Sequence, residues 1–142
     1  MHAASLSLKL AAAGDAVAAL LHVGCIVFGA PWYRFFGAGE RMARMADAGN
    51  PRAARVTSGI VLALLVWTAY ALSGAGLLPP LPWSRVALFA IAGVLVLRGV
   101  GGIGIALSGK HPRPAFWWWS SLICLALGAL HGFGAWWLPQ HA

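Results

Sequence analysis

Acidic residues are scarce in this chain. Only Asp15, Glu40 and Asp47 carry a carboxylate among 142 residues, and charged side chains of both signs together make up 9% of the sequence. Catalysis by paired carboxylates, as in glycosidases and aspartic proteases, requires two acids at one site. This scarcity argues against that class of enzyme.

Cysteine is nearly as rare. Cys25 and Cys124 are the only two, each lies inside an apolar segment, and they form no CxxC motif. A thioredoxin-like motif and a zinc-knuckle spacing are therefore both absent. We interpret the two thiols as small buried hydrophobic groups, and the sequence predicts no metal site.

Apolar residues, in contrast, dominate the composition. They account for 61% of the sequence, and the mean hydropathy is +0.79. A helix satisfies its own backbone hydrogen bonds in lipid, whereas a barrel needs alternating strand segments of about ten residues, which this chain lacks. We predict an all-α integral membrane four-helix bundle in which residues 1–142 form a single transmembrane domain.

Four segments are long enough to cross a bilayer, which takes about 20 helical residues. The predicted spans are residues 10–30, 56–76, 86–107 and 116–138. Pro31 is expected to end the first span, and the prolines at 79, 80 and 82 are expected to form a turn after the second. We expect the first span to be retained rather than cleaved as a signal peptide, because it contains Asp15 and is longer than a usual signal core.

A short helix on the membrane surface is predicted between the first two spans, over residues 35–48. Phe35, Ala38, Met42 and Met45 recur at helical spacing, and the opposite face carries Glu40, Arg41, Arg44 and Asp47. Glu40 and Arg44 stand four residues apart, which favours a pair along the helix. A solvated connector is the alternative interpretation.

The positive charges predict an orientation. Seven Lys and Arg residues fall on one side of the predicted membrane and two, Lys9 and Arg85, on the other; the seven are Arg34, Arg41, Arg44, Arg52, Arg55, Lys110 and Arg113. Cytoplasmic loops retain the excess of positive charge, so both termini are predicted on the non-cytoplasmic side of the inner (plasma) membrane. The basic residues form no continuous stripe, so the net charge of +7 indicates anionic lipid headgroups, and no nucleic acid, as the counter-charge.

Arg98 is the most informative single residue. It lies within the third span, with twelve uncharged residues before it and eleven after it. A charge at that depth requires a partner or a water-filled niche. Asp15 is the preferred intrachain partner because it is the only acid within a span, and helix packing through neighbouring carbonyls is the structural alternative.

The other polar residues of the spans fall at two predicted depths. At about 1.5 Å per residue from the cytoplasmic edge, Arg98 lies at ~14 Å and His22 at ~12 Å, whereas Asp15 and His131 both lie at ~22 Å. Asp15 and His22 share one face of the first span. We therefore predict a polar bundle interior that binds or passes a small solute or proton. The residues predicted to line it are Arg98, His22, Asp15 and His131. The structural alternative for the histidines is a hydrogen-bonded place in the core.

The glycines of the last two spans predict close helix packing. Gly128 and Gly132 form a GxxxG pattern, and the third span contains Gly93, Gly99, Gly101, Gly102 and Gly104. Packing within one chain is the preferred interpretation. The same glycines are also candidate contacts in a homo-oligomer, which a continuous pore would require.

Two other functions stay open. The chain is alternatively an accessory or assembly subunit of a larger membrane complex, with Arg98 paired to a carboxylate of the partner. A haem- or metal-binding redox protein using His22 and His131 is disfavoured, because the two imidazoles differ by ~10 Å in predicted depth. No nucleophile and base pair indicates an enzyme, and no motif identifies a cofactor, a substrate or a characterised family.

Overall fold

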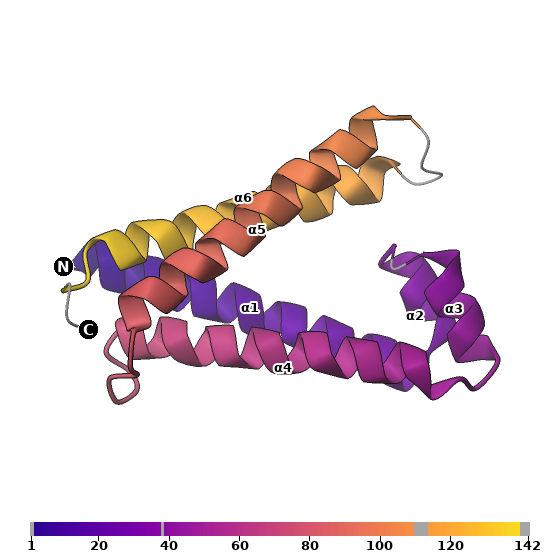
Figure 1. The fold of residues 1–142 in the computed structure, drawn as a ribbon, viewed down its shortest axis with the longest axis horizontal. Coiled ribbons are helices and arrows are strands. Elements are labelled where there is room, and N and C mark those ends of the chain that lie inside the picture. Colours follow the sequence, from indigo (N-terminus) through magenta and orange to yellow (C-terminus); the bar gives the residue numbers. More distant parts are fainter. Residues whose placement is uncertain (1, 38, 110–113, 140–142) are drawn as a thin grey trace. The chain divides into compact units, whose positions relative to one another are not determined.

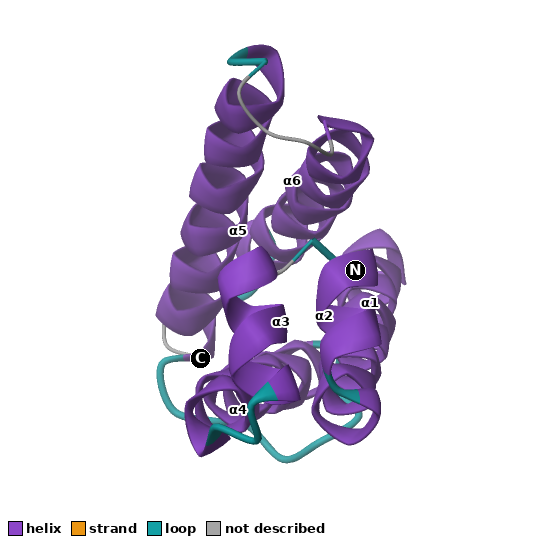
Figure 2. Ribbon diagram, turned by 90° about the vertical axis from the view of Figure 1, so that its right-hand side faces the viewer, coloured by secondary structure: helices purple, strands orange, loops and turns teal. Residues whose placement is uncertain are grey.

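The computed structural model describes residues 2–37, 39–109 and 114–139. In these residues the structure contains six helices and no strand, as Figures 1 and 2 show. The helices are α1 (His2–Phe28), α2 (Ala30–Phe35), α3 (Glu40–Asp47), α4 (Pro51–Gly74), α5 (Ser84–Leu107) and α6 (Pro114–Trp136). The predicted all-α class is confirmed.

Four of these helices, α1, α4, α5 and α6, are long and apolar enough to cross a membrane. The prediction of four helices long and apolar enough to span a membrane is therefore confirmed. The bounds differ most at the first two: α1 begins at His2 and α4 at Pro51, each earlier than the predicted span. Backbone hydrogen bonding continues past the edge of an apolar run, so a helix extends into residues that hydropathy assigns to a loop.

The end of α1 corrects one expectation. Gly29, not Pro31, ends this helix, because Gly29 has a φ of 69° in the left-handed region that glycine adopts without strain. Pro31 lies in the first turn of α2, where a missing backbone N–H costs nothing.

The segment between the first two spans forms two short helices. Sequence predicted one helix over residues 35–48, whereas α2 and α3 are separated by Gly37 and Gly39, which have φ values of 63° and 93°. Met42 and Met45 of α3 pack against a buried cluster of the protein itself, which consists of Cys25, Ala30, Tyr33, Ala43 and Ala53. Ala38 lies outside the described residues.

Contacts divide the chain into two compact units. Unit 1 consists of Met1–Asp15 and Val66–Ala142, and unit 2 of Ala16–Leu65. The core of unit 1 contains Leu8, Ala12, Ala71, Leu88, Ile91, Leu95, Leu127 and Ala135. The core of unit 2 is the cluster beneath α2 and α3. Helices α1 and α4 each contribute residues to both units.

Within unit 1, α5 and α6 lie side by side and antiparallel (Figure 1). Glycine permits this approach: a Cβ at Gly99 would lie 2.6 Å from Cγ of Leu125, and one at Gly128 would lie 3.2 Å from the carbonyl oxygen of Ala92. The glycines at 93, 101 and 104 face open space instead. The GxxxG pattern of α6 thus serves packing within the chain.

Candidate functional site

A carboxylate and an imidazole are the ionisable groups among the fully buried polar residues of the described chain. Asp15 on α1 and His131 on α6 are both 0% exposed. Nε2 of His131 lies 3.1 Å from Oδ2 of Asp15. This contact lacks hydrogen-bond geometry, so Oδ1 and Oδ2 of Asp15 and Nε2 of His131 are all buried without a hydrogen-bond partner in the described structure.

The other ring nitrogen defines the protonation of the pair. Nδ1 of His131 lies 2.9 Å from the backbone oxygen of Leu127, which only accepts hydrogen bonds, so Nδ1 carries a proton. A neutral ring would then present a lone pair at Nε2 to the carboxylate, and two acceptors at 3.1 Å repel each other. The 3.1 Å separation is therefore favourable when one of the two groups holds a further proton.

Small residues bring the two helices close enough for this contact. Gly14 precedes Asp15, and a Cβ there would collide with the Leu127 side chain of α6. Gly134, three residues after His131, makes the same room for Leu8 of α1. Each leucine fills the space over the glycine of the other helix, and Asp15 directly follows one of these glycines.

Arg98 occupies a different environment. Its side chain is exposed on α5, its Nη2 donates to Oγ of Ser120 at 3.4 Å, and its guanidinium carbon lies 4.8 Å from the centre of the Trp117 ring. Gly102 makes room for the guanidinium, because a Cβ there would lie 2.6 Å from Nη1. Both partners are uncharged, so the positive charge of Arg98 is not neutralised by them.

The guanidinium extends towards the first turn of α6. The backbone of α5 at Gly99 lies against Ser121 and Leu125, whereas the guanidinium contacts Trp117 and Ser120. This offset of about four residues corresponds to ~6 Å along the helix axis. Long basic side chains near a membrane place their charge closer to the interface in this way.

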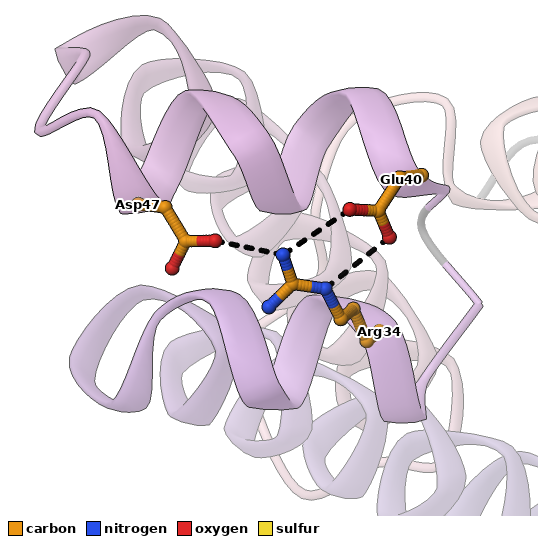
Figure 3. A network of polar contacts seen from close by, with 3 residues as sticks. All are labelled: Arg34, Glu40 and Asp47. Atoms are coloured by element: carbon orange, nitrogen blue, oxygen red, sulfur yellow. Dashed lines mark hydrogen bonds and ion pairs between the residues drawn. The ribbon is translucent and has the colours of Figure 1, made fainter.

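Both remaining acids bind one arginine outside the spans. Arg34 of α2 contacts Glu40 and Asp47 of α3, with Nη2 lying 3.2 Å from Oε1 of Glu40 and 2.7 Å from Oδ2 of Asp47 (Figure 3). The hydrogen bonds from Arg34 hold the pKa of Glu40 below its ordinary value. Glu40 forms its ion pair with Arg34, because the turn at Gly37 and Gly39 folds α3 back on α2, and the charge of Arg44 also lowers the pKa of Glu40.

The acids of the chain are thus fully accounted for. All three lie among the described residues, Asp15 with His131 and the other two with Arg34. The expected Asp15–Arg98 pair does not form, because the imidazole occupies the carboxylate. Sequence reasoning missed Trp117, Ser120 and buried Ser121 beside Arg98, although the Ser120–Ser121 pair is the signal that interrupts the apolar run of α6.

The remaining predicted site residue lies in unit 2. His22 is half-buried, and its Nδ1 lies 2.7 Å from the backbone oxygen of Ala18, one turn earlier in α1. His131 presents both ring nitrogens to protein atoms, which leaves neither directed at a haem iron in this arrangement. Over the described ranges, no three His, Cys, Asp or Glu side chains gather as metal ligands.

The four candidate membrane-spanning helices suggest a multi-pass membrane protein in a lipid bilayer. Comparison of the chain with models of protein families, with curated proteins and with solved structures gives no match.

Proposed function

We propose that this protein binds a proton within its transmembrane bundle and passes it on, with Asp15 and His131 as the proton-holding pair. One observation supports the proposal: two fully buried ionisable groups lie 3.1 Å apart, a separation at which a proton held by one group can pass to the other. Ionisable residues in membrane spans are costly to bury and are typical of proton relays.

The geometry supports two forms of the pair. In one, His131 is a cation beside the Asp15 carboxylate; in the other, the carboxyl group is neutral and donates to the neutral ring. The two forms carry the same total charge, so the proton moves between the residues without a second charge entering the bundle. Oδ1 of Asp15, buried and without a hydrogen-bond partner, offers a further acceptor to an incoming proton.

Proton flux in liposomes tests the proposal. The full chain is reconstituted in vesicles that contain a pH-sensitive dye, and a pH gradient is applied. Asp15→Asn and His131→Gln should each abolish protein-dependent flux, because each removes one holder of the proton. His22→Gln is the matched control, since the hydrogen bond described for His22 goes to a carbonyl of its own helix and not to Asp15 or His131. Flux that survives both substitutions at Asp15 and His131 would contradict the proposal.

We also propose an orientation in the inner membrane. The excess of Lys and Arg in the first and third connections supports a cytoplasmic location for them and an external location for both termini. Cysteine-accessibility labelling at engineered positions in the α2–α3 segment tests this orientation, and labelling by a membrane-impermeant reagent from the outside would oppose it.

A second function is favoured by Arg98. The three acids of the chain are engaged elsewhere, so the exposed guanidinium has no carboxylate partner in the described residues. A carboxylate from another membrane protein would neutralise it, as in an accessory or assembly subunit. Co-purification of a partner at fixed stoichiometry, lost in Arg98→Leu and kept in Arg85→Leu, would support this role. A self-sufficient oligomer with unchanged behaviour in Arg98→Leu would oppose it.

A further inference from the structure

We infer that the cavity between α3 and the start of α4 is a binding site for one anionic phospholipid, held by its phosphodiester. The cavity has a volume of about 470 Å³ and belongs to unit 2. Its lining combines three arginines with apolar side chains: Arg41, Met42, Met45, Arg52, Arg55 and Val56.

The charge at this cavity is uncompensated. Arg34 binds both acids of the segment, Glu40 and Asp47, through the network in Figure 3. Within the described part of the chain, Arg41, Arg52 and Arg55 therefore form no ion pair with a carboxylate. Three arginine residues at one cavity fit a phosphate, because the forked N–H donors of a guanidinium group match its oxygens.

The apolar walls indicate an amphiphile rather than a small soluble anion. Met42 and Met45 line the cavity beside the arginines, and Val56 begins a charge-free run that continues to Ser84. The cavity thus lies at the boundary between the basic start of α4 and its apolar continuation. A phosphodiester beside the arginines would leave its acyl chains along the exposed Val56 and Ile60 of α4.

The net charge of the headgroup follows from the same lining. A zwitterionic headgroup brings its own cation, which would lie near three arginines without an acid to receive it. A headgroup with net negative charge, such as that of phosphatidylglycerol, avoids this repulsion. The inference is independent of the proposed proton transfer, and Asp15→Asn should leave lipid binding unchanged.

Native mass spectrometry of the full chain in a non-ionic detergent tests the inference. Titration with phosphatidylglycerol should show one lipid retained per chain, and phosphatidylcholine should bind more weakly. Arg52→Gln and Arg55→Gln should each weaken binding by about tenfold, the effect of losing one charge-assisted hydrogen bond. Circular dichroism verifies that each variant folds. If one of the two α4 variants does not fold, Arg41→Gln on α3 is used in its place, because Arg41 lines the same cavity.

Arg44→Gln is the matched control, because Arg44 is exposed on α3 and does not line the cavity. It should change binding by less than about twofold, since it removes the same charge but no contact. An equal loss in Arg44→Gln and Arg52→Gln would show diffuse attraction to basic loops and overturn the site. Displacement of the lipid by inorganic phosphate at equal concentration would overturn the lipid assignment in favour of a soluble anion.

Discussion

Asp15 and His131 differ from every other polar pair described in the structure, because neither side chain reaches solvent. Burying two ionisable groups costs several kcal/mol, and their mutual attraction offsets this only when both are present. The pair therefore makes two contributions, one to the packing of α1 on α6 and one to the chemistry proposed for the bundle, and substitutions separate them.

A double-mutant cycle measures how much the Asp15–His131 pair contributes to the packing of α1 on α6. Asp15→Leu or His131→Leu alone should lower the free energy of unfolding by about 3–5 kcal/mol, because each leaves the other group buried without a partner. Asp15→Leu with His131→Leu should recover most of that loss, since an apolar pair needs no partner. Thermal unfolding in detergent provides the measurement, and additive losses in the double variant would show that the two groups are not coupled.

The contact between Arg34 and Glu40 should make the stability of the α2–α3 segment depend on pH. Its hydrogen bonds lower the pKa of Glu40 from the ordinary value of 4.5. The stabilisation from Glu40 is therefore fully present above pH 4.5 and is lost as the pH falls below it, towards the lowered pKa of the folded state. At neutral pH, α3 should be better protected from hydrogen exchange than it is in Arg34→Gln. As the pH falls below 4.5, this difference in protection should disappear. Equal protection of the two proteins at neutral pH would contradict the role of Arg34.

Among the elements, α5 and α6 pack side by side, and glycine determines how closely they approach. A Cβ at Gly99 would lie 3.0 Å from the backbone oxygen of Ser121, which cannot move away as a side chain can. Gly101, two residues later on the same helix, meets nothing within 4 Å. The two positions share one helix and one residue type and differ only in what they face.

Gly99→Ala and Gly101→Ala form a matched pair of variants. Gly99→Ala should lower the free energy of unfolding by ~1–3 kcal/mol through overpacking. Gly101→Ala should have no destabilising effect, because alanine favours the helix and finds open space. Unfolding of both variants in the same detergent compares them. A loss of equal size at Gly101 would indicate a contact with a second chain on that face.

Considered over the full chain, the four spans could be predicted from sequence because hydropathy and length determine them almost alone. The Asp15–His131 contact was within reach of sequence too, since helical rise places the two residues at the same depth. The helical rise predicts the depth of a residue but not which way its side chain faces around the helix axis. The exposed position of Arg98 could therefore not be predicted. The Arg34 network depends on the fold of α3 back on α2, which the positive φ values of Gly37 and Gly39 establish.

The proposed function depends on a proton being held by Asp15 and His131, and infrared spectroscopy reports the protonation of the Asp15 carboxyl group. Difference spectra of the full chain in liposomes, recorded against pH with ¹³C-labelled aspartate, isolate the carboxyl bands of Asp15 and Asp47 from all others. We expect a pH-dependent carboxyl band that disappears in Asp15→Asn, shifts in His131→Gln and is unchanged in Asp47→Asn. A spectrum in which Asp15→Asn removes no pH-dependent band would contradict the account.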